Sequence, residues 1–389
     1  MRLLFVANRM PYPPYRGDKL KIYNLAKELQ NHSLDLITIA ENQEDIDSIE
    51  PLRDIFNRID YVFIPRWKSF LNTFLTLFSN EPFQIGYFRS ARFREQVYDV
   101  MKKGDYDGIH VQHIRMAQFI PSEFKHKVVL DLPDAFSMYW KRRYHSAKNP
   151  FIKAFNFLEY KRLNHFEIQT IPTFPQTLVC SKEDQRYLSK IKGAKVDVLP
   201  NGVDTKTFAS SEEAFIKNRI LFTGNMDYAP NIDAVQYFVH QIFPIIQNEI
   251  PEVEFIIAGQ RPVPKVCELA SEQVKVTGFI ENLAKEYAKA HVVVSPLRIG
   301  AGTQNKVLEA LSMDIPVVTT YVGYEGLGLP DGIGALPSKD ANEFAHNVVR
   351  ILRDDEFRLK MASEGGKAIR DSFSWPSIAK QLEKYLTFK

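Results

Sequence analysis

Short apolar segments alternate with longer amphipathic segments along most of the chain. Apolar runs of roughly four to eight residues, bounded by turn-forming residues, are typical of strands buried on both faces of a parallel sheet. In the first half of the chain, these runs lie at residues 3–7, 34–40, 61–64, 108–111, 128–132 and 177–180. Amphipathic segments, among them residues 19–31 and 91–103, separate the runs and are predicted helices.

The same order begins again in the second half. Predicted strands lie at residues 220–223, 254–258, 274–277, 292–295 and 316–319, with predicted helices at residues 231–250, 283–290 and 304–313. A turn-forming Pro200-Asn201-Gly202 segment separates the two series. We therefore expect two doubly wound α/β domains that face a cleft, where a ligand binds at the carboxyl ends of the strands.

Composition excludes several protein classes. The 389 residues are 45% hydrophobic and 25% charged, as in folded globular proteins, and no apolar run approaches the roughly 20 residues of a membrane-spanning helix. Cys180 and Cys267 lie far apart, which argues against a disulfide framework or a structural zinc site and favours a reducing cytoplasm.

Charge is distributed unevenly between the two halves. Residues 1–200 contain 30 Lys and Arg against 23 Asp and Glu, whereas the remainder contains 20 against 24. This asymmetry is consistent with an N-terminal half that faces a membrane surface or a phosphate-bearing substrate. A chance spread of solvated charges explains it equally well.

The segment from Ser295 to Leu311 carries the most specific chemistry. A predicted strand ends at Ser295, and Gly300 and Gly302 then allow the backbone to approach a ligand closely. Thr303 is expected to cap the following helix, whose first N–H groups would bind an anion.

Three charged residues extend this predicted anion site. Arg298 and Lys306 add positive charge near the helix start. Glu309 lies about 9 Å farther along the helix axis, roughly the distance from a pyrophosphate to the ribose of a nucleotide. The alternative is an ordinary surface pair of Lys306 and Glu309 beside a simple glycine turn.

Several motifs in order resemble family 4 glycosyltransferases with the GT-B fold. They comprise residues 198–204 (Val-Leu-Pro-Asn-Gly-Val-Asp), 222–226 (Phe-Thr-Gly-Asn-Met), 276–280 (Val-Thr-Gly-Phe-Ile) and the Glu309 helix followed by Pro316-Val317-Val318. Residues 13–18 (Pro-Pro-Tyr-Arg-Gly-Asp) are similar to the family's glycine-rich loop, and Phe373-Ser374-Trp375 with the following helix resembles its C-terminal helix. The resemblance implies an acceptor-binding domain at residues 1–199, a nucleotide-sugar-binding domain at 200–372, and a helix at 373–389 that crosses back to the first domain.

The resemblance also implies roles for single residues of a donor site. Glu309 matches the glutamate that binds the ribose hydroxyls, and Phe279 and Ile280 match the segment that contacts the base. The remaining matches concern the loops beside the sugar and phosphates, with Gly17, Gly224, Asn225, Gly300, Gly302, Thr303 and Gln304 as the expected donor-binding residues.

The chain departs from the family pattern at two places. Ala301 stands where relatives carry a first glutamate that contacts the donor sugar, and Asn225 stands where they carry a basic residue. Arg298 and Lys306 are expected to supply the missing positive charge, as in a subgroup with a Pro-Leu-Arg-x-Gly-x-Gly-Thr loop.

A histidine near the end of a predicted strand is the candidate contact to the donor sugar. Relatives often carry a histidine at or near the position of Gln112 or His113, and His113 is the favoured one, with His110 on the buried side of the strand. A hydrogen-bonded structural histidine is the alternative for His113.

No catalytic metal or other cofactor is predicted. Asp-x-Asp sequences at residues 45–47 and 105–107 lack a site-like context and are read as solvated carboxylates. The cationic loop and the helix N-terminus would stabilise the departing diphosphate instead. The resemblance further implies that the configuration of the sugar is retained.

Two stretches are both aromatic and basic: residues 66–78, with Arg89, Arg92 and Arg94 beyond them, and residues 139–157. Such composition suits a lipid headgroup interface, which would bring the enzyme to a lipid-linked acceptor. Core packing of a helical subdomain is an equal alternative. Nucleic-acid binding is not expected, because no recognition module accompanies the charge.

The sequence therefore predicts a retaining, metal-independent glycosyltransferase. It would move a sugar from a nucleotide-diphosphate sugar, with a UDP-sugar favoured, to a hydroxyl of a surface polysaccharide or lipid-linked glycan. His113, Glu309, Arg298 and Lys306 are the expected catalytic residues. The alternatives are a catalytically silent nucleotide-sugar-binding GT-B protein and a GT-B nucleotide-sugar epimerase. The expected location is cytoplasmic, with peripheral contact to the inner face of the membrane as a further possibility.

Overall fold

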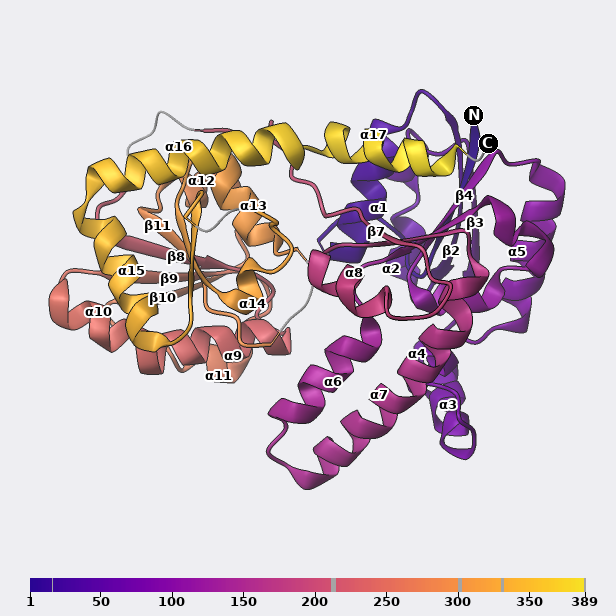
Figure 1. Cartoon of the computed structure of the whole chain (residues 1–389), viewed down its shortest axis with the longest axis horizontal. Helices are drawn as coiled ribbons and strands as arrows, with labels where there is room; N and C mark the ends of the chain where they lie inside the picture. The colour runs from indigo at the N-terminus through magenta and orange to yellow at the C-terminus, as the bar shows by residue number, and fades with distance from the viewer. Residues whose placement is uncertain (16, 211–214, 300–302, 330–331, 388–389) are drawn as a thin grey trace. The chain divides into compact units, whose positions relative to one another are not determined.

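Contacts between residues divide the chain into two units. The computed structural model describes residues 1–15, 17–210, 215–299, 303–329 and 332–387. Unit 1 comprises Met1–Pro200 and Trp375–Lys389, and unit 2 comprises Asn201–Ser374 (Figure 1). Within the described ranges, every helix is too short or too polar to cross a lipid bilayer.

Unit 1 is built on a seven-stranded parallel sheet of order β3-β2-β1-β4-β5-β6-β7. The strands are β1 (Arg2–Ala7), β2 (Ser33–Ala40), β3 (Arg58–Phe63), β4 (Gly108–Gln112), β5 (Val128–Leu132), β6 (Gln176–Val179) and β7 (Val196–Val198). The order reverses direction between β1 and β4, which is where ligands bind in sheets of this type.

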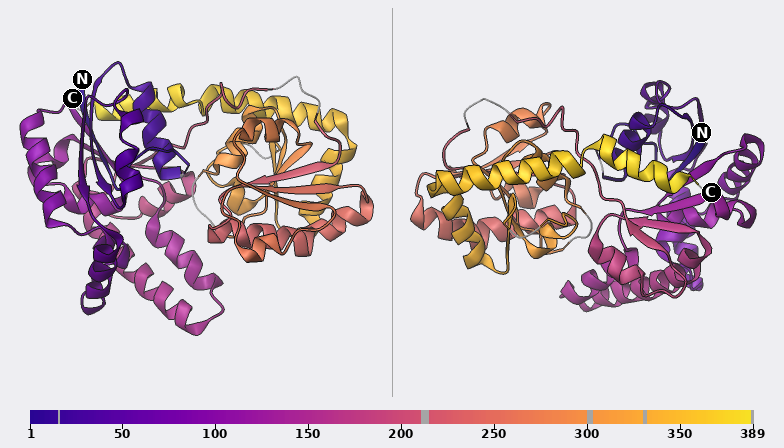
Figure 2. Two further views of the ribbon diagram at one scale, coloured as in Figure 1. Left: turned by 180° about the vertical axis from the view of Figure 1, so that it is seen from behind. Right: turned by 45° about the horizontal axis from the view of Figure 1, so that its top comes forward.

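Helices cover both faces of the unit 1 sheet (Figures 1 and 2). They are α1 (Gly17–Glu28), α2 (Gln43–Asp47), α3 (Arg66–Leu75), α4 (Phe83–Tyr87), α5 (Ala91–Gly104), α6 (Phe136–Ser146), α7 (Pro150–Thr170), α8 (Lys182–Leu188) and α17 (Trp375–Leu386), with short 3₁₀ turns η2 (Thr76–Phe78) and η3 (Ile114–Phe119). One hydrophobic core lies between the sheet and α5, and a second lies between the opposite face and α1 with α17. Gly108 permits this packing, because a Cβ there would lie 2.6 Å from the carbonyl oxygen of Leu386.

Unit 2 contains a six-stranded parallel sheet of order β10-β9-β8-β11-β12-β13. The strands are β8 (Arg219–Thr223), β9 (Glu254–Ala258), β10 (Val274–Gly278), β11 (Val292–Ser295), β12 (Val317–Thr320) and β13 (Ala335–Ser338). Its helices are α9 (Ala229–Tyr237), α10 (Phe243–Glu249), α11 (Pro264–Cys267), α12 (Leu283–Ala288), α13 (Asn305–Ser312), α14 (Tyr321–Tyr324), α15 (Ala341–Arg353) and α16 (Asp355–Ser372). One core lies under α9, α10 and α15, and the other under α12, α13 and α16.

The predicted pair of doubly wound parallel sheets is confirmed, and the differences have local causes. β13 escaped prediction because it contains Pro337, a residue that a sheet accepts at its edge, where β13 lies. β7 has only three residues, too few for a periodic signal. The predicted helix at 231–250 contains a π-helical turn at Phe238–Ile242 between α9 and α10.

Candidate functional site

A hydrogen-bonded carboxylate lies beside the carboxyl edge of the unit 2 sheet. The Tyr287 hydroxyl on α12 is fully buried and donates to Glu309 Oε2 on α13 over 2.8 Å. Thr223 Oγ1, at the end of β8, lies 2.7 Å from the same hydroxyl. Burial raises the pKa of the partly buried Glu309, although the Tyr287 hydrogen bond and the Lys306 charge oppose the shift.

Lys306 lies in the first turn of α13 and is 7% exposed. Its Nζ donates to Asn231 Oδ1 over 2.9 Å and lies 3.9 Å from the centre of the Phe222 ring. Burial lowers the pKa of Lys306 to about 7, while Glu309 opposes the shift. The alternative of an ordinary surface pair is therefore wrong for this lysine, because its ammonium is buried.

The loop after β8 is held close to Lys306. A Cβ at Gly224 would lie 2.6 Å from Asn231 Nδ2, so a larger residue at this position would displace the Asn231 side chain. Asn231 Nδ2 donates to the carbonyl oxygen of Asn225 over 3.0 Å, and Gln260 Nε2 donates to Asn225 Oδ1 over 2.7 Å. The structure thus brings Gly224, Asn225 and Lys306 together through Asn231, a residue that the sequence analysis missed.

Arg298 follows β11 and is engaged by α9. Its Nε donates to Asp233 Oδ2 over 2.9 Å, and its Nη2 donates to Asp233 Oδ1. The guanidinium also lies 4.6 Å from the centre of the Tyr237 ring. The Asp233 contact raises the pKa of Arg298, so the guanidinium stays positively charged. This charge is paired with Asp233 within unit 2.

The predicted N-cap of α13 is wrong by one residue. Gln304 holds the capping position and α13 begins at Asn305, whereas the Thr303 hydroxyl donates to the Gly326 carbonyl oxygen over 3.5 Å. The intrinsic preference of threonine for N-caps is outweighed here by this tertiary contact. Gly300 and Gly302, two further predicted site residues, lie outside the described residues.

The predicted base-contacting segment follows β10. Gly278 has a φ of 73°, a left-handed conformation that favours glycine and turns the chain after the strand. Phe279 beyond it is 62% exposed and Ile280 is partly buried in the core under α12 and α13. The Phe279 ring is thus an exposed aromatic surface just beyond the end of β10.

In unit 1, His113 directly follows β4 with a φ of 85°. Its backbone N–H donates to the Asp131 carbonyl oxygen over 2.7 Å, and its ring packs against Phe136. The ring is 3% exposed, and its buried Nδ1 has no hydrogen-bond partner within the described part of the chain. Burial, together with the charges of Arg115 and Arg9, holds the pKa of His113 well below its usual value.

His110 occupies the buried side of β4, as predicted, in a charged network that the sequence analysis missed. Its Nε2 lies 3.0 Å from Asp131 Oδ2, and the Lys21 ammonium donates to Asp131 Oδ1 over 2.8 Å. Burial opposes ionisation of Asp131, but Lys21 and His110 outweigh it and hold its pKa below the usual range. The only sequence signal was the aspartate itself, placed inside an otherwise apolar strand.

Gly17 is the exposed first residue of α1. The carbonyl oxygen of the next residue, Asp18, accepts a hydrogen bond from Gln112 Nε2 over 2.8 Å. The structure thus places the first turn of α1 beside the end of β4, where His113 lies. Across the described ranges, His, Cys, Asp and Glu side chains form no group of three or more that could hold a metal ion.

Comparison with known proteins identifies the architecture. Residues 217–354 match the family model described as Glycosyl transferases group 1. An uncharacterized glycosyltransferase of Methanocaldococcus jannaschii is 25% identical over 405 residues, covering 95% of this chain and 94% of that protein.

Two solved structures extend the likeness over the whole chain. Sucrose-phosphate synthase from Thermosynechococcus elongatus is 19% identical and superposes with a TM-score of 0.75, covering 99% of this chain and 98% of that one. HepE of Anabaena, solved in complex with UDP, is 15% identical with a TM-score of 0.70 and complete coverage (100%) of both chains. The chain is therefore a glycosyltransferase with the GT-B fold, and its unit 2 carries the match to Glycosyl transferases group 1.

Proposed function

We propose that this glycosyltransferase transfers a sugar from a nucleotide-diphosphate sugar, with a UDP-sugar favoured, to a hydroxyl of a surface polysaccharide or lipid-linked glycan. One observation carries the proposal. Glu309 and the buried Lys306 lie on the same short helix, α13, and the Glu309 carboxylate accepts a hydrogen bond from Tyr287. A nucleotide donor requires a carboxylate that accepts hydrogen bonds from the two ribose hydroxyls, and a cation that faces the diphosphate.

The arrangement along α13 supports a proposed position for each part of the donor. The start of the helix and Lys306 bind the diphosphate, because both the helix N-terminus and the ammonium favour negative charge. Glu309 binds the ribose, and the exposed Phe279 ring contacts the base. The UDP bound to the structurally similar HepE of Anabaena supports a uridine nucleotide as the first choice.

The proposed transfer requires no metal and retains the sugar configuration. The bond between the anomeric carbon and the phosphate oxygen breaks, and Lys306 with the helix N-terminus stabilises the charge that develops on the diphosphate. The acceptor hydroxyl oxygen attacks the anomeric carbon from the same face, and its proton passes to the departing phosphate oxygen. His113 is the proposed sugar contact in unit 1, where its neutral ring can donate or accept one hydrogen bond.

Calorimetric titration of UDP, GDP and ADP, with and without EDTA, tests the donor site. We expect one nucleotide to bind regardless of EDTA, and Glu309→Ala to weaken that binding at least tenfold, about 1.4 kcal/mol. Glu356→Ala, which removes an exposed carboxylate from α16, is the matched control and should leave binding unchanged. Absence of binding, or binding indifferent to Glu309, would refute the site. Release of UDP from a UDP-sugar would separate an active transferase from a silent binding protein.

A further inference from the structure

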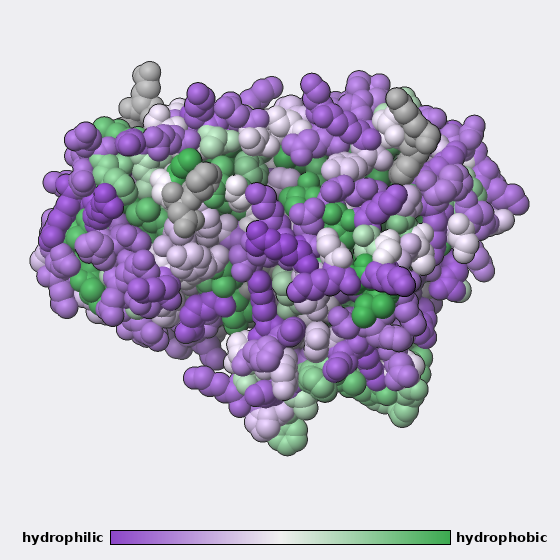
Figure 3. Space-filling model, viewed as in Figure 1, coloured by the Kyte–Doolittle hydropathy of each residue, from purple (hydrophilic) through white to green (hydrophobic). Residues whose placement is uncertain are grey.

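Unit 1 exposes large hydrophobic side chains on two helical projections. Six of them define a surface that we call the aromatic rim: Trp67, Phe70 and Phe74 of α3, Phe78 of η2, and Phe151 and Ile152 of α7. Trp67, Phe78 and Phe151 are 68%, 81% and 84% exposed. Hydrophobic residues gather at this edge of unit 1, over α3 and the tip of the α6–α7 hairpin, among hydrophilic neighbours (Figure 3).

Core packing does not explain these side chains, because other aromatics of the same helical region are the ones that are buried. Phe83 and Trp140 are 6% exposed, and Phe83 stacks on Phe155 with ring centres 5.2 Å apart. The sequence analysis left core packing and a headgroup interface open for these stretches. The structure separates them, since the rim residues lie outside this packed layer.

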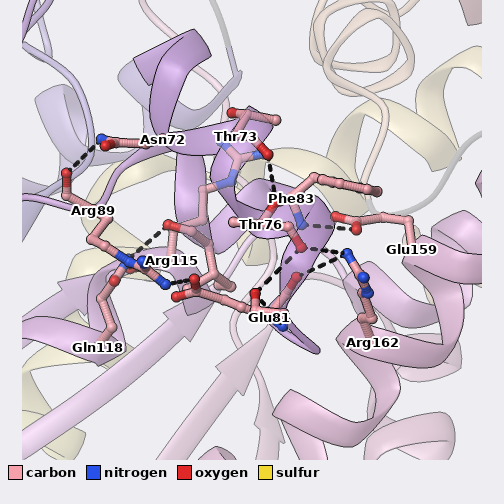
Figure 4. A network of polar contacts seen from close by, with 12 residues as sticks. Asn72, Thr73, Thr76, Glu81, Phe83, Arg89, Arg115, Gln118, Glu159 and Arg162 are labelled. Atoms are coloured by element: carbon pink, nitrogen blue, oxygen red, sulfur yellow. Dashed lines mark hydrogen bonds and ion pairs between the residues drawn. The ribbon is translucent and has the colours of Figure 1, made fainter. Parts of the chain in front are cut away.

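A buried polar network joins the two projections (Figure 4). Glu159 of α7 is fully buried and accepts hydrogen bonds from the backbone N–H groups of Phe83 and Gln84 over 2.9 and 3.1 Å. Arg162, one turn farther along α7, donates to the carbonyl oxygens of Thr76 and Glu81 over 3.1 and 3.3 Å. These hydrogen bonds connect the α3–η2 segment to α7, the two parts that carry the aromatic rim. The rim side chains are therefore exposed on segments that are packed and hydrogen-bonded to each other.

The charge around the rim is strongly positive. Residues 138–166 contain seven Lys and Arg and one acidic residue, Glu159, which is the buried one described above. Lys148, Lys153 and Lys161 are exposed, and residues 66–78 contain two basic residues and no acidic one. A second copy of this chain would oppose the same positive charge, whereas a surface of anionic lipid would complement it.

We propose that the aromatic rim docks unit 1 onto an anionic phospholipid bilayer, with Trp67, Phe78 and Phe151 entering the headgroup region and the surrounding lysines contacting lipid phosphates. Aromatic side chains are favoured at this depth because their rings are apolar and polarisable, and nearby lysines keep their ammonium groups at the surface. The proposal is independent of the donor site in unit 2, since none of its residues belongs to that site.

Vesicle flotation of the full-length chain tests the docking surface. We expect flotation with vesicles of phosphatidylcholine and phosphatidylglycerol, weaker flotation with phosphatidylcholine alone, and loss of binding at high salt. The double variant Phe78→Ser/Phe151→Ser should bind at least tenfold more weakly. Leu359→Ser, which removes a 58% exposed leucine from α16 of unit 2, is the matched control and should bind as the wild type does.

Native tryptophan fluorescence gives a second readout. Trp67 is exposed, whereas Trp140 and Trp375 are 6% and 3% exposed, so a blue shift on adding anionic vesicles would report Trp67 entering the bilayer. UDP binding by each variant shows that its fold and donor site are intact, and it separates failure of the docking surface from failure of the donor site. The proposal would be overturned if the double variant and the wild type floated equally, or if neither floated. It would also be overturned if the wild type were a dimer that this variant converts to a monomer.

Discussion

The hydroxyl of Tyr287 donates a hydrogen bond of 2.8 Å to Glu309 Oε2, across 22 residues of sequence. This contact orients the carboxylate that we assign to the ribose of the donor. Tyr287→Phe keeps the buried ring and removes the donor, so we expect nucleotide affinity to fall about threefold to tenfold, less than in Glu309→Ala. Calorimetry with the nucleotide that the wild type binds is the measurement.

Tyr237→Phe is the control for that variant, because it removes a partly buried tyrosine hydroxyl on α9. It should bind nucleotide as the wild type does. Unchanged affinity in Tyr287→Phe would show that Glu309 needs no orientation by the tyrosine.

The depressed pKa of Lys306 predicts a pH-dependent donor affinity. In the free protein this pKa is about 7, because the ammonium is buried. A bound diphosphate favours the charged form, so binding above pH 7 must take up a proton, and affinity should fall by up to about tenfold per pH unit between pH 7 and 9. Titration at pH 8 in buffers of different ionisation enthalpy measures the proton uptake directly. The uptake should vanish in Lys306→Met, and its persistence there would place the titrating group elsewhere.

His113 is expected to remain neutral throughout the working pH range, because burial holds its pKa well below the usual value. His113→Ala should slow release of UDP from the donor at least tenfold and leave UDP affinity within about twofold, since the proposed contact is to the sugar. The wild-type pH–rate profile should show no histidine limb near pH 6.5. His346→Ala, on an exposed position of α15, serves as the control. Parallel losses of UDP affinity and turnover would indicate a structural histidine instead.

The buried pair of Lys21 and Asp131 predicts a large effect on the stability of unit 1. Both side chains are at most 1% exposed, and their charged atoms lie 2.8 Å apart. Asp131→Asn leaves the ammonium without its counter-charge, which should cost about 3–5 kcal/mol. All three tryptophans belong to unit 1, so urea unfolding followed by tryptophan fluorescence reports this unit. Glu50→Gln, which breaks an exposed pair with Arg53, should change stability by less than about 1 kcal/mol.

Replacing Glu167 is expected to stabilise unit 1, in contrast to the destabilising Asp131→Asn change. Burial raises its pKa to about 7, and its oxygens accept hydrogen bonds from the backbone N–H and hydroxyl of Ser137. The folded protein thus holds a proton that the unfolded chain releases near pH 4.5, so this group's contribution to stability is lost as pH rises from 4.5 to 7. Glu167→Gln removes the titration and should stabilise unit 1 at pH 8 by at most about 3 kcal/mol. The gain should shrink toward pH 5, and a gain independent of pH would contradict this origin.

Local information in the sequence was sufficient for eleven of the thirteen strands of the two parallel sheets and for several of the helices, among them α1, α5, α12 and α13. Buried parallel strands are continuous apolar runs, and the helices between them follow the 3.6-residue period, so each element can be recognised from its own residues. The helix carrying Lys306 and Glu309 was predictable for the same reason. The order of motifs along the chain then indicated a glycosyltransferase.

The tertiary structure decided which of these residues contact one another and which meet solvent. Tyr287 reaches Glu309, Asn231 reaches Lys306, and Lys21 reaches Asp131 across 22, 75 and 110 residues of sequence. Phe78 is exposed and Phe83 is buried, although they are the same residue type and lie only five positions apart in the sequence. Hydrophobicity alone does not distinguish the two. Contacts between distant segments determine burial, and burial sets both the pKa values at the candidate site and which side chains of the aromatic rim remain exposed.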